Sequence, residues 1–443
     1  MNRDLLRDLY ATVAAALLVA AAAVVGTVIE HRHGTLYVNW PPLFARWEPH
    51  IGPGTPAALA VAAAVVVYGP SLAARLPWRV LLLAAWGTAM AWTWSLALVD
   101  GWQRGVAGRL TTREEYLRVI GRFHDIPGTL RDFTHHILEG SPDYWPAHVA
   151  GHPPGATLTF VLLDRTGLGG GAWAGAWCIT VGTTAAVAVL IGVRALAGEA
   201  LARHAAPFLV LAPAAVWVGT SADGYFSAVA AWAVAFLALA VTGSRPGAAG
   251  LASGLLFGLT VYLSYGLTLF AVIAGAVLVL GTRRLRPLPF LLAGLAVVPV
   301  AFTVAGFDWW EAYPLLVRRY YQGIGGARPY SYWIWANLAC TVVIVGPATV
   351  AGLRRAAATV IPSVRARVPA TPETRLAVLV FATLAALLVA DVSGMSKAET
   401  ERIWLPFAMW LLPACAYLTR PRAWLTAQAV LALLVNHLLL TGW

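Results

Sequence analysis

The chain is poor in charge, in lysine and in cysteine. Only 12% of its 443 residues are charged, whereas 59% are apolar. A soluble protein of this length needs far more charged surface, so soluble enzymes, disordered chains and disulfide scaffolds are excluded. Lys397 is the single lysine, and the three cysteines, Cys178, Cys340 and Cys415, all lie in apolar runs. An odd number of cysteines in such runs supports neither a disulfide framework nor a zinc site.

Long apolar runs dominate the sequence, and they predict an all-α polytopic membrane protein of about 13 transmembrane helices. Each run must be helical, because lipid cannot satisfy open backbone groups. The thirteen candidates are residues 10–29, 57–72, 79–98, 171–194, 205–219, 224–243, 250–266, 267–281, 288–305, 332–351, 375–393, 403–418 and 424–441. A shorter run, 155–163, predicts an interfacial or re-entrant helix. We expect an N-terminal transmembrane hairpin, residues 1–78, followed by a transmembrane module, residues 79–443.

The arginines predict how the helices are oriented. The net charge of +11, from 31 basic and 20 acidic residues, fits the excess of basic residues in short cytoplasmic loops, so it needs no nucleic-acid partner. The arginines in the short loops between spans all lie on the cytoplasmic side if the N-terminus is cytoplasmic. They include Arg3, Arg7, Arg75, Arg79, Arg194, Arg203, Arg245, Arg283, Arg284, Arg286, Arg354, Arg355, Arg420 and Arg422. We therefore expect a multi-pass plasma-membrane protein whose C-terminus and whose long loop, residues 99–153, are extracytoplasmic.

This outer loop carries most of the groups that could do chemistry. Its acids are Asp100, Glu114, Glu115, Asp125, Asp132, Glu139 and Asp143. A helix is predicted to begin at Thr111 or Thr112, with Glu114 and Glu115 in its first turn and an apolar face on the membrane. The two glutamates are either helix-capping acids or carboxylates held at the membrane edge, one of them as a base. The sequence leaves both interpretations open.

Two later features are predicted to lie on the same extracytoplasmic side as these acids. His152 precedes Pro153 and Pro154 at the end of the loop. Asp223 stands where a later apolar span begins, and it is either an ordinary N-cap or a second carboxylate of the site.

The order of these motifs resembles the GT-C superfamily of membrane glycosyltransferases, of an actinobacterial type. It is most similar to the polyprenyl-phosphate-mannose protein mannosyltransferases and the aminoarabinose transferases. Those enzymes have an Asp-Glu-x-x-Tyr type motif in the first large outer loop, then a His-Pro-Pro or Lys-Pro-Pro motif, then an aspartate before a span. Here Glu114-Glu115-Tyr116, His152-Pro153-Pro154 and Asp223 follow in that order. The departures are Glu-Glu in place of Asp-Glu, the immediate tyrosine, and the additional span pair at the start.

The resemblance implies an inverting glycosyltransferase of the cell envelope. It would move a sugar, mannose-like or a pentose, from a polyprenyl-phosphate donor to a hydroxyl of a glycan or protein acceptor at the outer face of the lipid bilayer. The acceptor hydroxyl needs a base, for which Glu115 is the first choice and Glu114, Asp100 and Asp223 are rivals. The leaving phosphate needs fixed positive charge, and the expected ligands are His152, Arg318, Arg319, Arg328, Lys397 and Arg402. The alternative for the arginines and the lysine is anchoring at the membrane interface beside Trp and Tyr.

Two further questions stay open at this stage. No cofactor is required by the sequence, although a divalent cation would suit the chemistry, and the His148-x-x-x-His152 spacing is no metal site unless it lies on a helix. The alternative functions are a multi-pass transporter, for which His437 would be a mid-span polar group, and a lipid-linked glycan ligase or flippase of the envelope.

Overall fold

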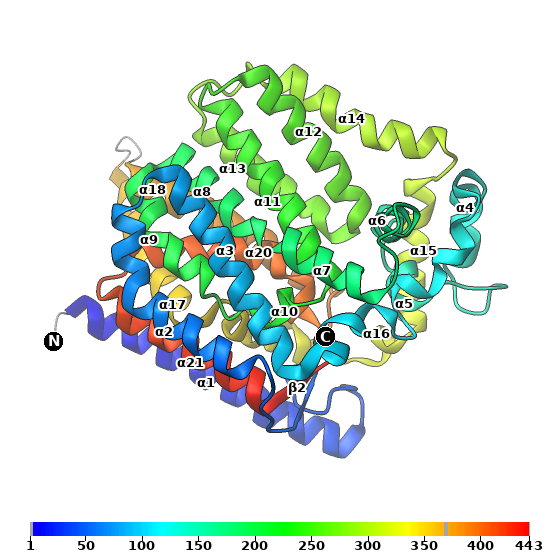
Figure 1. The fold of residues 1–443 in the computed structure, drawn as a ribbon, viewed down its shortest axis with the longest axis horizontal. Helices are drawn as coiled ribbons and strands as arrows, with labels where there is room; N and C mark the ends of the chain where they lie inside the picture. The colour runs from blue at the N-terminus through cyan, green and yellow to red at the C-terminus, as the bar shows by residue number, and fades with distance from the viewer. Residues whose placement is uncertain (1–2, 367–370, 443) are drawn as a thin grey trace.

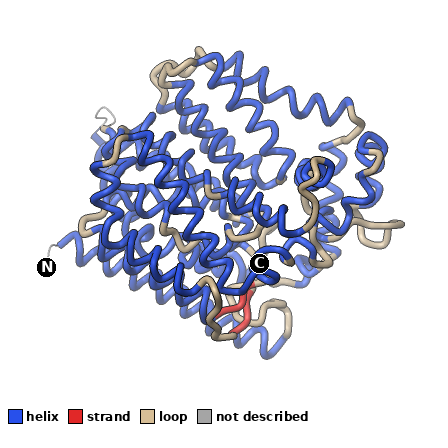
Figure 2. The backbone as a smooth tube through the Cα atoms, in the orientation of Figure 1, coloured by secondary structure: helices blue, strands red, loops and turns tan. Residues whose placement is uncertain are grey.

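The computed structural model describes residues 3–366 and 371–442. Nearly every segment in that part of the chain is helical (Figures 1 and 2). The two strands found there, β1 (Ala45–Trp47) and β2 (Leu439–Thr441), pair antiparallel with Ala45 opposite Thr441. This short ribbon joins a segment near the start of the sequence to one near its end.

Eight helices among the described residues are long and apolar enough to cross a membrane. They are α1 (Arg3–His33), α2 (Thr55–Arg75), α3 (Trp78–Ala97) continued by η1 (Leu98–Asp100), α7 (Gly171–Gly182) joined to α8 (Thr184–Ala197), α11 (Ala222–Val241), α12 (Pro246–Leu263), α17 (Tyr330–Ala366) and α18 (Pro372–Val392). A ninth span would be α14 (Leu288–Val304) taken with α15 (Trp309–Gln322) across a 79° bend. The chain is thus an all-α multi-pass membrane protein, while the predicted count of thirteen spans stays unconfirmed.

Several of the predicted spans are short or broken. The pieces are α9 (Glu199–Val210) and α10 (Ala215–Val218), η6 (Tyr265–Leu269) and α13 (Phe270–Leu280), α19 (Thr400–Ile403), α20 (Leu405–Leu411) and η7 (Leu412–Tyr417), and α21 (Pro421–Leu438). The predicted span 205–219 is not one helix, because the chain leaves helical geometry at Leu211 and Pro213 follows. Proline lacks the N–H that would continue the backbone ladder. The predicted boundary at Tyr265 matches an extended Ser264 at the end of α12.

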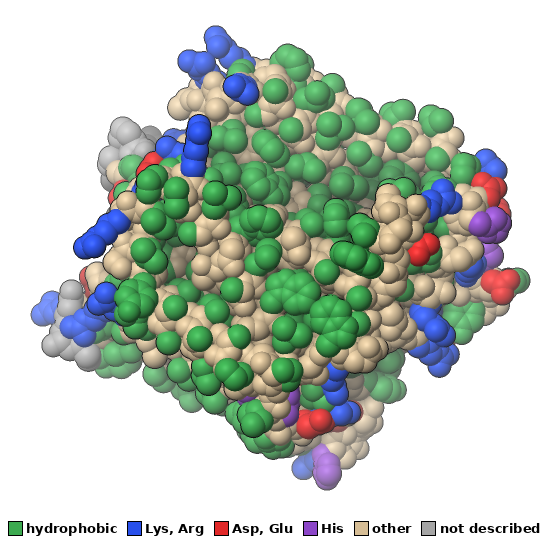
Figure 3. Space-filling model, in the orientation of Figure 1, with side chains coloured by type: hydrophobic (Ala, Val, Ile, Leu, Met, Phe, Trp, Pro, Cys, Tyr) green, Lys and Arg blue, Asp and Glu red, His purple; other side chains and the backbone are tan. Residues whose placement is uncertain are grey.

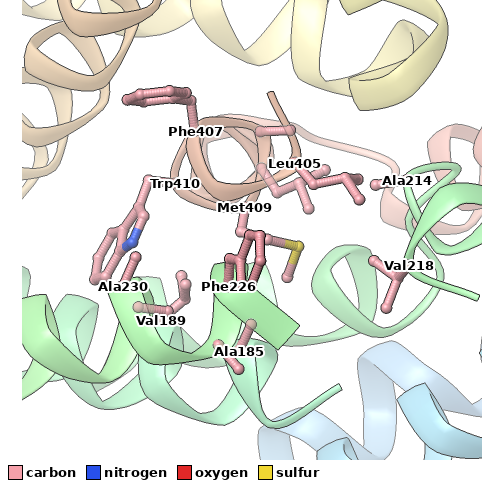
Figure 4. Packing of buried hydrophobic residues seen from close by; sticks show 14 of the residues in the cluster. Ala185, Val189, Ala214, Val218, Phe226, Ala230, Leu405, Phe407, Met409 and Trp410 are labelled. Atoms are coloured by element: carbon pink, nitrogen blue, oxygen red, sulfur yellow. The ribbon is translucent and has the colours of Figure 1, made fainter. Parts of the chain in front are cut away.

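The protein core surrounds α11, the most buried of the candidate spans. In Figure 4, side chains of α20 such as Trp410 and Met409 lie over Phe226 and Ala230 of α11. Gly192 of α8 provides the space for this contact, because a Cβ there would meet the Trp410 ring at 2.7 Å. The core therefore fixes both the start of α11 and the segment that leads into α20.

The N-terminal helix is tied to the rest of the protein by charge as well as by packing. α1 packs along α17. Its buried Asp8 pairs with Arg354 at 2.7 Å and with Arg355 at 2.6 Å. The segment predicted as an N-terminal hairpin is thus in extensive contact with the later helices.

The outer loop and its neighbours form a cap at one end of the molecule. Its helices are η2 (Gln103–Ala107), η3 (Arg109–Thr111), η4 (Tyr116–Phe123), α4 (Ile126–Asp132), η5 (Phe133–His136), α5 (Ala147–Ala150) and α6 (Pro154–Arg165). In Figure 1, α4, α5, α6, α15 and α16 (Ile324–Ala327) lie together on the right, far from the N-terminus on the left. On the face seen in Figure 3, histidines and most acids lie along the right and lower margins, beside a broad hydrophobic area. The orientation of the cap relative to the cell stays a prediction.

Two expectations about this loop are corrected. The helix begins at Tyr116 rather than at Thr111 or Thr112, so Glu115 precedes it in an extended conformation. The apolar face that was expected to lie on the membrane packs against protein instead, because Tyr116 and Phe123 are buried and the Tyr116 ring packs on Phe160 of α6 at 5.4 Å. The run predicted as a short helix at 155–163 does form one, as α6.

Candidate functional site

A cleft in the cap brings together residues that are far apart in the sequence. About 330 Å³ of space, part of it open to solvent, lies between its residues. Its lining residues are Arg109, Thr112, Glu115, Tyr116, His148, Thr220, Ser221, Ala222, Asp223, Arg402 and Gly442. Three of the predicted site residues, Glu115, Asp223 and Arg402, therefore meet in one place, although they come from the outer loop, the start of α11 and α19.

Arg402 is the central charge of this cleft, and it is only 5% exposed. Its guanidinium donates to Asp223 Oδ2 at 2.5 Å and to Glu399 Oε2 at 3.2 Å. Burial alone would lower the pKa of Arg402, but the carboxylates of Asp223, Glu399 and Glu115 outweigh it and raise the pKa above its usual value. The cleft thus contains a permanent cation between carboxylates.

His148 connects Arg402 to Glu115. Arg402 Nη2 lies 2.9 Å from His148 Nε2, and His148 Nδ1 lies 2.9 Å from Glu115 Oε1. A guanidinium can only donate hydrogen bonds, so Nε2 must be the acceptor and Nδ1 must carry the proton. Burial raises the pKa of Glu115, but His148 and Arg402 together outweigh it, so the net pKa is lowered and the group is a carboxylate. His148 was missed as a site residue, because the sequence offered only its spacing to His152.

The question of whether Asp223 is a helix cap is settled by the backbone. Ser221 is the N-cap of α11, and its side chain accepts a hydrogen bond from Gly224 N at 3.4 Å. Asp223 stands in the first turn, so its carboxylate is available to Arg402. Thr220 before the cap has a left-handed φ of 61° and donates to Gly105 O at 2.7 Å. This bond ties the start of α11 to the outer loop.

Asp100 belongs to a neighbouring cluster and does not line the cleft. It accepts hydrogen bonds from His50 and Arg109, each at 2.8 Å. Arg109 reaches the cleft and also donates to Thr441 O at 3.2 Å. Burial lowers the pKa of Arg109 to about 10, so it stays charged at neutral pH. Arg109 was not singled out from the sequence, because six arginines of the loop carry no distinguishing spacing.

Glu114, the other glutamate of the motif, does not line the cleft and stabilises the loop. Its Oε2 accepts from Ala147 N at 2.9 Å, and its backbone oxygen accepts from His148 N at 3.2 Å. These two bonds hold the segment that carries His148 next to the segment that carries Glu115.

The other predicted phosphate ligands lie outside the cleft lining. Lys397 donates to Gly325 O at 3.0 Å, and Arg328 donates to Lys397 O at 2.8 Å. Both side chains are buried and brace the segment that leads to Arg402. Arg319 pairs with Glu139, and Arg318 is exposed.

His152 lies behind the cleft, against Tyr116. The two rings are 5.8 Å apart, and His152 Nδ1 donates to His148 O at 2.7 Å. Burial lowers the pKa of His152 to about 4, so the ring is neutral at pH 7. With its proton on Nδ1, the neutral ring has only an acceptor at Nε2, so in this state it cannot donate a hydrogen bond to a phosphate.

No group of three His, Cys, Asp or Glu residues that could hold a metal ion occurs in the described part of the chain. The divalent cation considered from the sequence therefore stays a prediction, for which the described residues offer no cluster of ligands. His437, the residue behind the transporter alternative, lies at the end of α21, and its Nε2 is 3.0 Å from Thr55 Oγ1.

Comparisons with known proteins give a fold likeness only. No protein-family model and no curated protein matches the sequence. Solved structures of the oligosaccharyltransferase of Archaeoglobus fulgidus do match. The form tethered to an acceptor peptide has a TM-score of 0.42 at 12% identity over 76% of this chain. The apo form has 0.41 at 16% over 76%, and the complex with Zn and sulfate has 0.40 at 15% over 80%. The chain covers about half the length of each, 49%, 50% and 51%.

Proposed function

We propose that the chain is a glycosyltransferase that moves a sugar from a polyprenyl phosphate to an acceptor hydroxyl at the outer face of the membrane. The observation that supports this most is the buried chain of Glu115, His148, Arg402 and Asp223 in one cleft. Such a cleft offers a basic group and a fixed cation within a few ångströms of each other, which are the two things that glycosyl transfer from a phosphate needs.

The proposed reaction is a single displacement. The acceptor oxygen forms a bond to the anomeric carbon while the bond from that carbon to the phosphate oxygen breaks, and the phosphate keeps the electron pair. The proton of the acceptor passes to the basic centre, which is the Glu115–His148 pair. Arg402 and Arg109 are the cations of the cleft lining, and they stabilise the charge that develops on the leaving phosphate.

A lipid-linked donor fits the position of the cleft. Its lining includes the first residues of α11, Ala222 and Asp223, and α11 is a candidate span. A phosphate at the cleft would therefore stand at the end of a membrane helix, where the headgroup of a lipid lies. A transporter would instead place its charged groups near mid-span.

The test is transfer from radiolabelled polyprenyl-phosphate mannose or pentose by purified protein in nanodiscs. Glu115→Gln is expected to lower turnover by about 10²–10⁴, the usual loss of a general base. Glu114→Gln is the matched control, because its amide oxygen can still accept the hydrogen bond from Ala147 N that holds the His148 segment; it should lose far less. Wild-type turnover in Glu115→Gln together with loss in Asp223→Asn or Asp100→Asn would reassign the base. No transfer from either donor by folded wild-type protein would refute the proposed function.

A further inference from the structure

The geometry points to His148 Nε2 as the atom that takes the acceptor's proton. Arg402 is hydrogen-bonded to this nitrogen and must leave it before the reaction. This inference rests on the proposed function and assigns a role within its basic centre. It makes Glu115 a positioning residue that acts through the imidazole.

The hydrogen-bond directions carry the first step. Because Arg402 has no acceptor atom, its contact at 2.9 Å with His148 Nε2 needs a lone pair on that nitrogen. The proton of the neutral ring is therefore on Nδ1, which faces Glu115 Oε1 at 2.9 Å. A carboxylate that holds a histidine in this tautomer also stabilises the imidazolium that forms when Nε2 takes a proton, as in hydrolase triads.

The surroundings of the two groups carry the second step. The Glu115 side chain is 8% exposed and the His148 side chain 13%, and both line the cleft. Glu115 Oε1 is hydrogen-bonded to His148, and the two bonds of Glu114 hold the backbone of residues 147–148 in place. On the His148 ring, Nε2 is the nitrogen directed away from Glu115 and toward the cation that would meet a phosphate.

Arg402 determines when Nε2 becomes available. In the structure its guanidinium is shared between His148, Asp223 and Glu399. A donor phosphate brings negatively charged oxygens, which form stronger bonds to arginine than a neutral imidazole does. Binding of the donor phosphate would thus draw Arg402 from His148 and expose the base.

The reaction then balances without another reagent. The acceptor hydroxyl gives its proton to Nε2, its oxygen bonds to the anomeric carbon, and the phosphate leaves with the electron pair of the broken bond. His148 is then an imidazolium next to the Glu115 carboxylate, and it returns the proton to the phosphate or to water.

A kinetic experiment tests the role of the imidazole. His148→Ala should lower turnover by about 10²–10⁴, and added imidazole should restore part of it, more strongly as pH rises through 7 and imidazole becomes a free base. Glu115→Gln in the His148→Ala background should cost little more, because the two residues act as a unit. The matched control is His136→Ala, whose ring is bonded to Pro142 O outside the cleft and which imidazole should not affect. Wild-type turnover in His148→Ala, or no rescue in a variant that still binds the donor, would overturn the inference.

A spectroscopic experiment separates this inference from the proposed function. Protein labelled with ¹⁵N-histidine, with the His148 signal assigned through His148→Gln, should show the Nδ1-protonated tautomer without any substrate. Polyprenyl phosphate should then shift the Nε2 signal as Arg402 leaves. A proton on Nε2 in the free protein, or an unchanged signal with saturating polyprenyl phosphate, would overturn the inference even if the protein transfers sugar. If the wild-type protein transfers no sugar, the proposed function fails whatever the tautomer.

Discussion

The bond between Asp223 and Arg402 should be worth more to stability than any other single contact of the cleft. Both side chains are 6% exposed, and the two atoms are 2.5 Å apart. Removing one partner of a buried ion pair costs about 3–5 kcal/mol, because the other charge is left uncompensated. Arg402 would keep Glu399 at 3.2 Å, so we expect Asp223→Asn to lie at the lower end, about 3 kcal/mol.

This loss converts into a measurable melting temperature. The entropy of unfolding is about 2.1 cal/mol/K per residue, or roughly 0.9 kcal/mol/K for a chain of this length. Asp223→Asn should therefore melt about 3 °C below the wild type in nanodiscs, followed by tryptophan fluorescence at a fixed scan rate. Asp132→Asn is the control, because its carboxylate is 68% exposed, and surface changes usually cost less than about 0.5 kcal/mol.

A double replacement sharpens the test. Asp223→Leu combined with Arg402→Met removes both charges, while Glu399 keeps Arg328 at 3.4 Å. The double variant should melt higher than Asp223→Asn alone, since apolar replacements of a buried pair are often neutral or stabilising. If Asp223→Asn has the same melting temperature as the Asp132→Asn control, or if the double variant is the least stable of the set, the reasoning about an uncompensated charge is wrong.

Three further outcomes are expected. Arg402→Ala should weaken binding of polyprenyl-phosphate mannose more than it reduces protein yield, and unchanged affinity would remove Arg402 from the donor site. A cysteine in place of the exposed Arg113 should react with an impermeant maleimide in intact cells, whereas one in place of Arg284 should react only after permeabilisation; the reverse pattern would invert the topology. Burial raises the pKa of Glu401 to about 7 from 4.5, so its stabilising contribution is complete below pH 4.5 and is lost as pH rises through 7. Glu401→Gln should therefore flatten the decline in melting temperature over this range, and an unchanged decline would assign it to another group.

Some of the site could be predicted from motif order, and some needed the fold. Glu115 and Asp223 were candidates because they occupy the acidic positions of the ordered motif set. Their meeting with Arg402 depends on contacts between segments up to 287 residues apart in sequence, which no local pattern encodes. The role of His148 depends on which nitrogen faces which neighbour, and only the packed structure decides this.

The helix start shows the same limit for local structure. Thr111 and Thr112 are good capping residues, yet Glu115 becomes the N-cap of η4. The packing of Tyr116 on Phe160 and the contacts of both glutamates with the 147–148 segment outweigh the local preference. Most of the apolar runs were read correctly as helical, but the run 424–441 ends in the strand β2, and the breaks at Leu211 and after Ile403 depend on prolines and packing inside the core.

The turn before α19 affects how the thermal stability of the protein could be raised by substitution. Ala398 and Glu399 both adopt left-handed backbone, with φ of 68° and 61°, directly before the segment that carries Arg402. A residue with a side chain pays about 1–3 kcal/mol for such a conformation. Glycine at position 398 would relieve this conformational cost and stabilise the protein, but the bend it relaxes is the one that orients the Arg402 guanidinium. A search for more heat-resistant variants would therefore tend to select this position while loosening the aim of Arg402, so thermal tolerance and catalytic rate should trade against each other at a single residue.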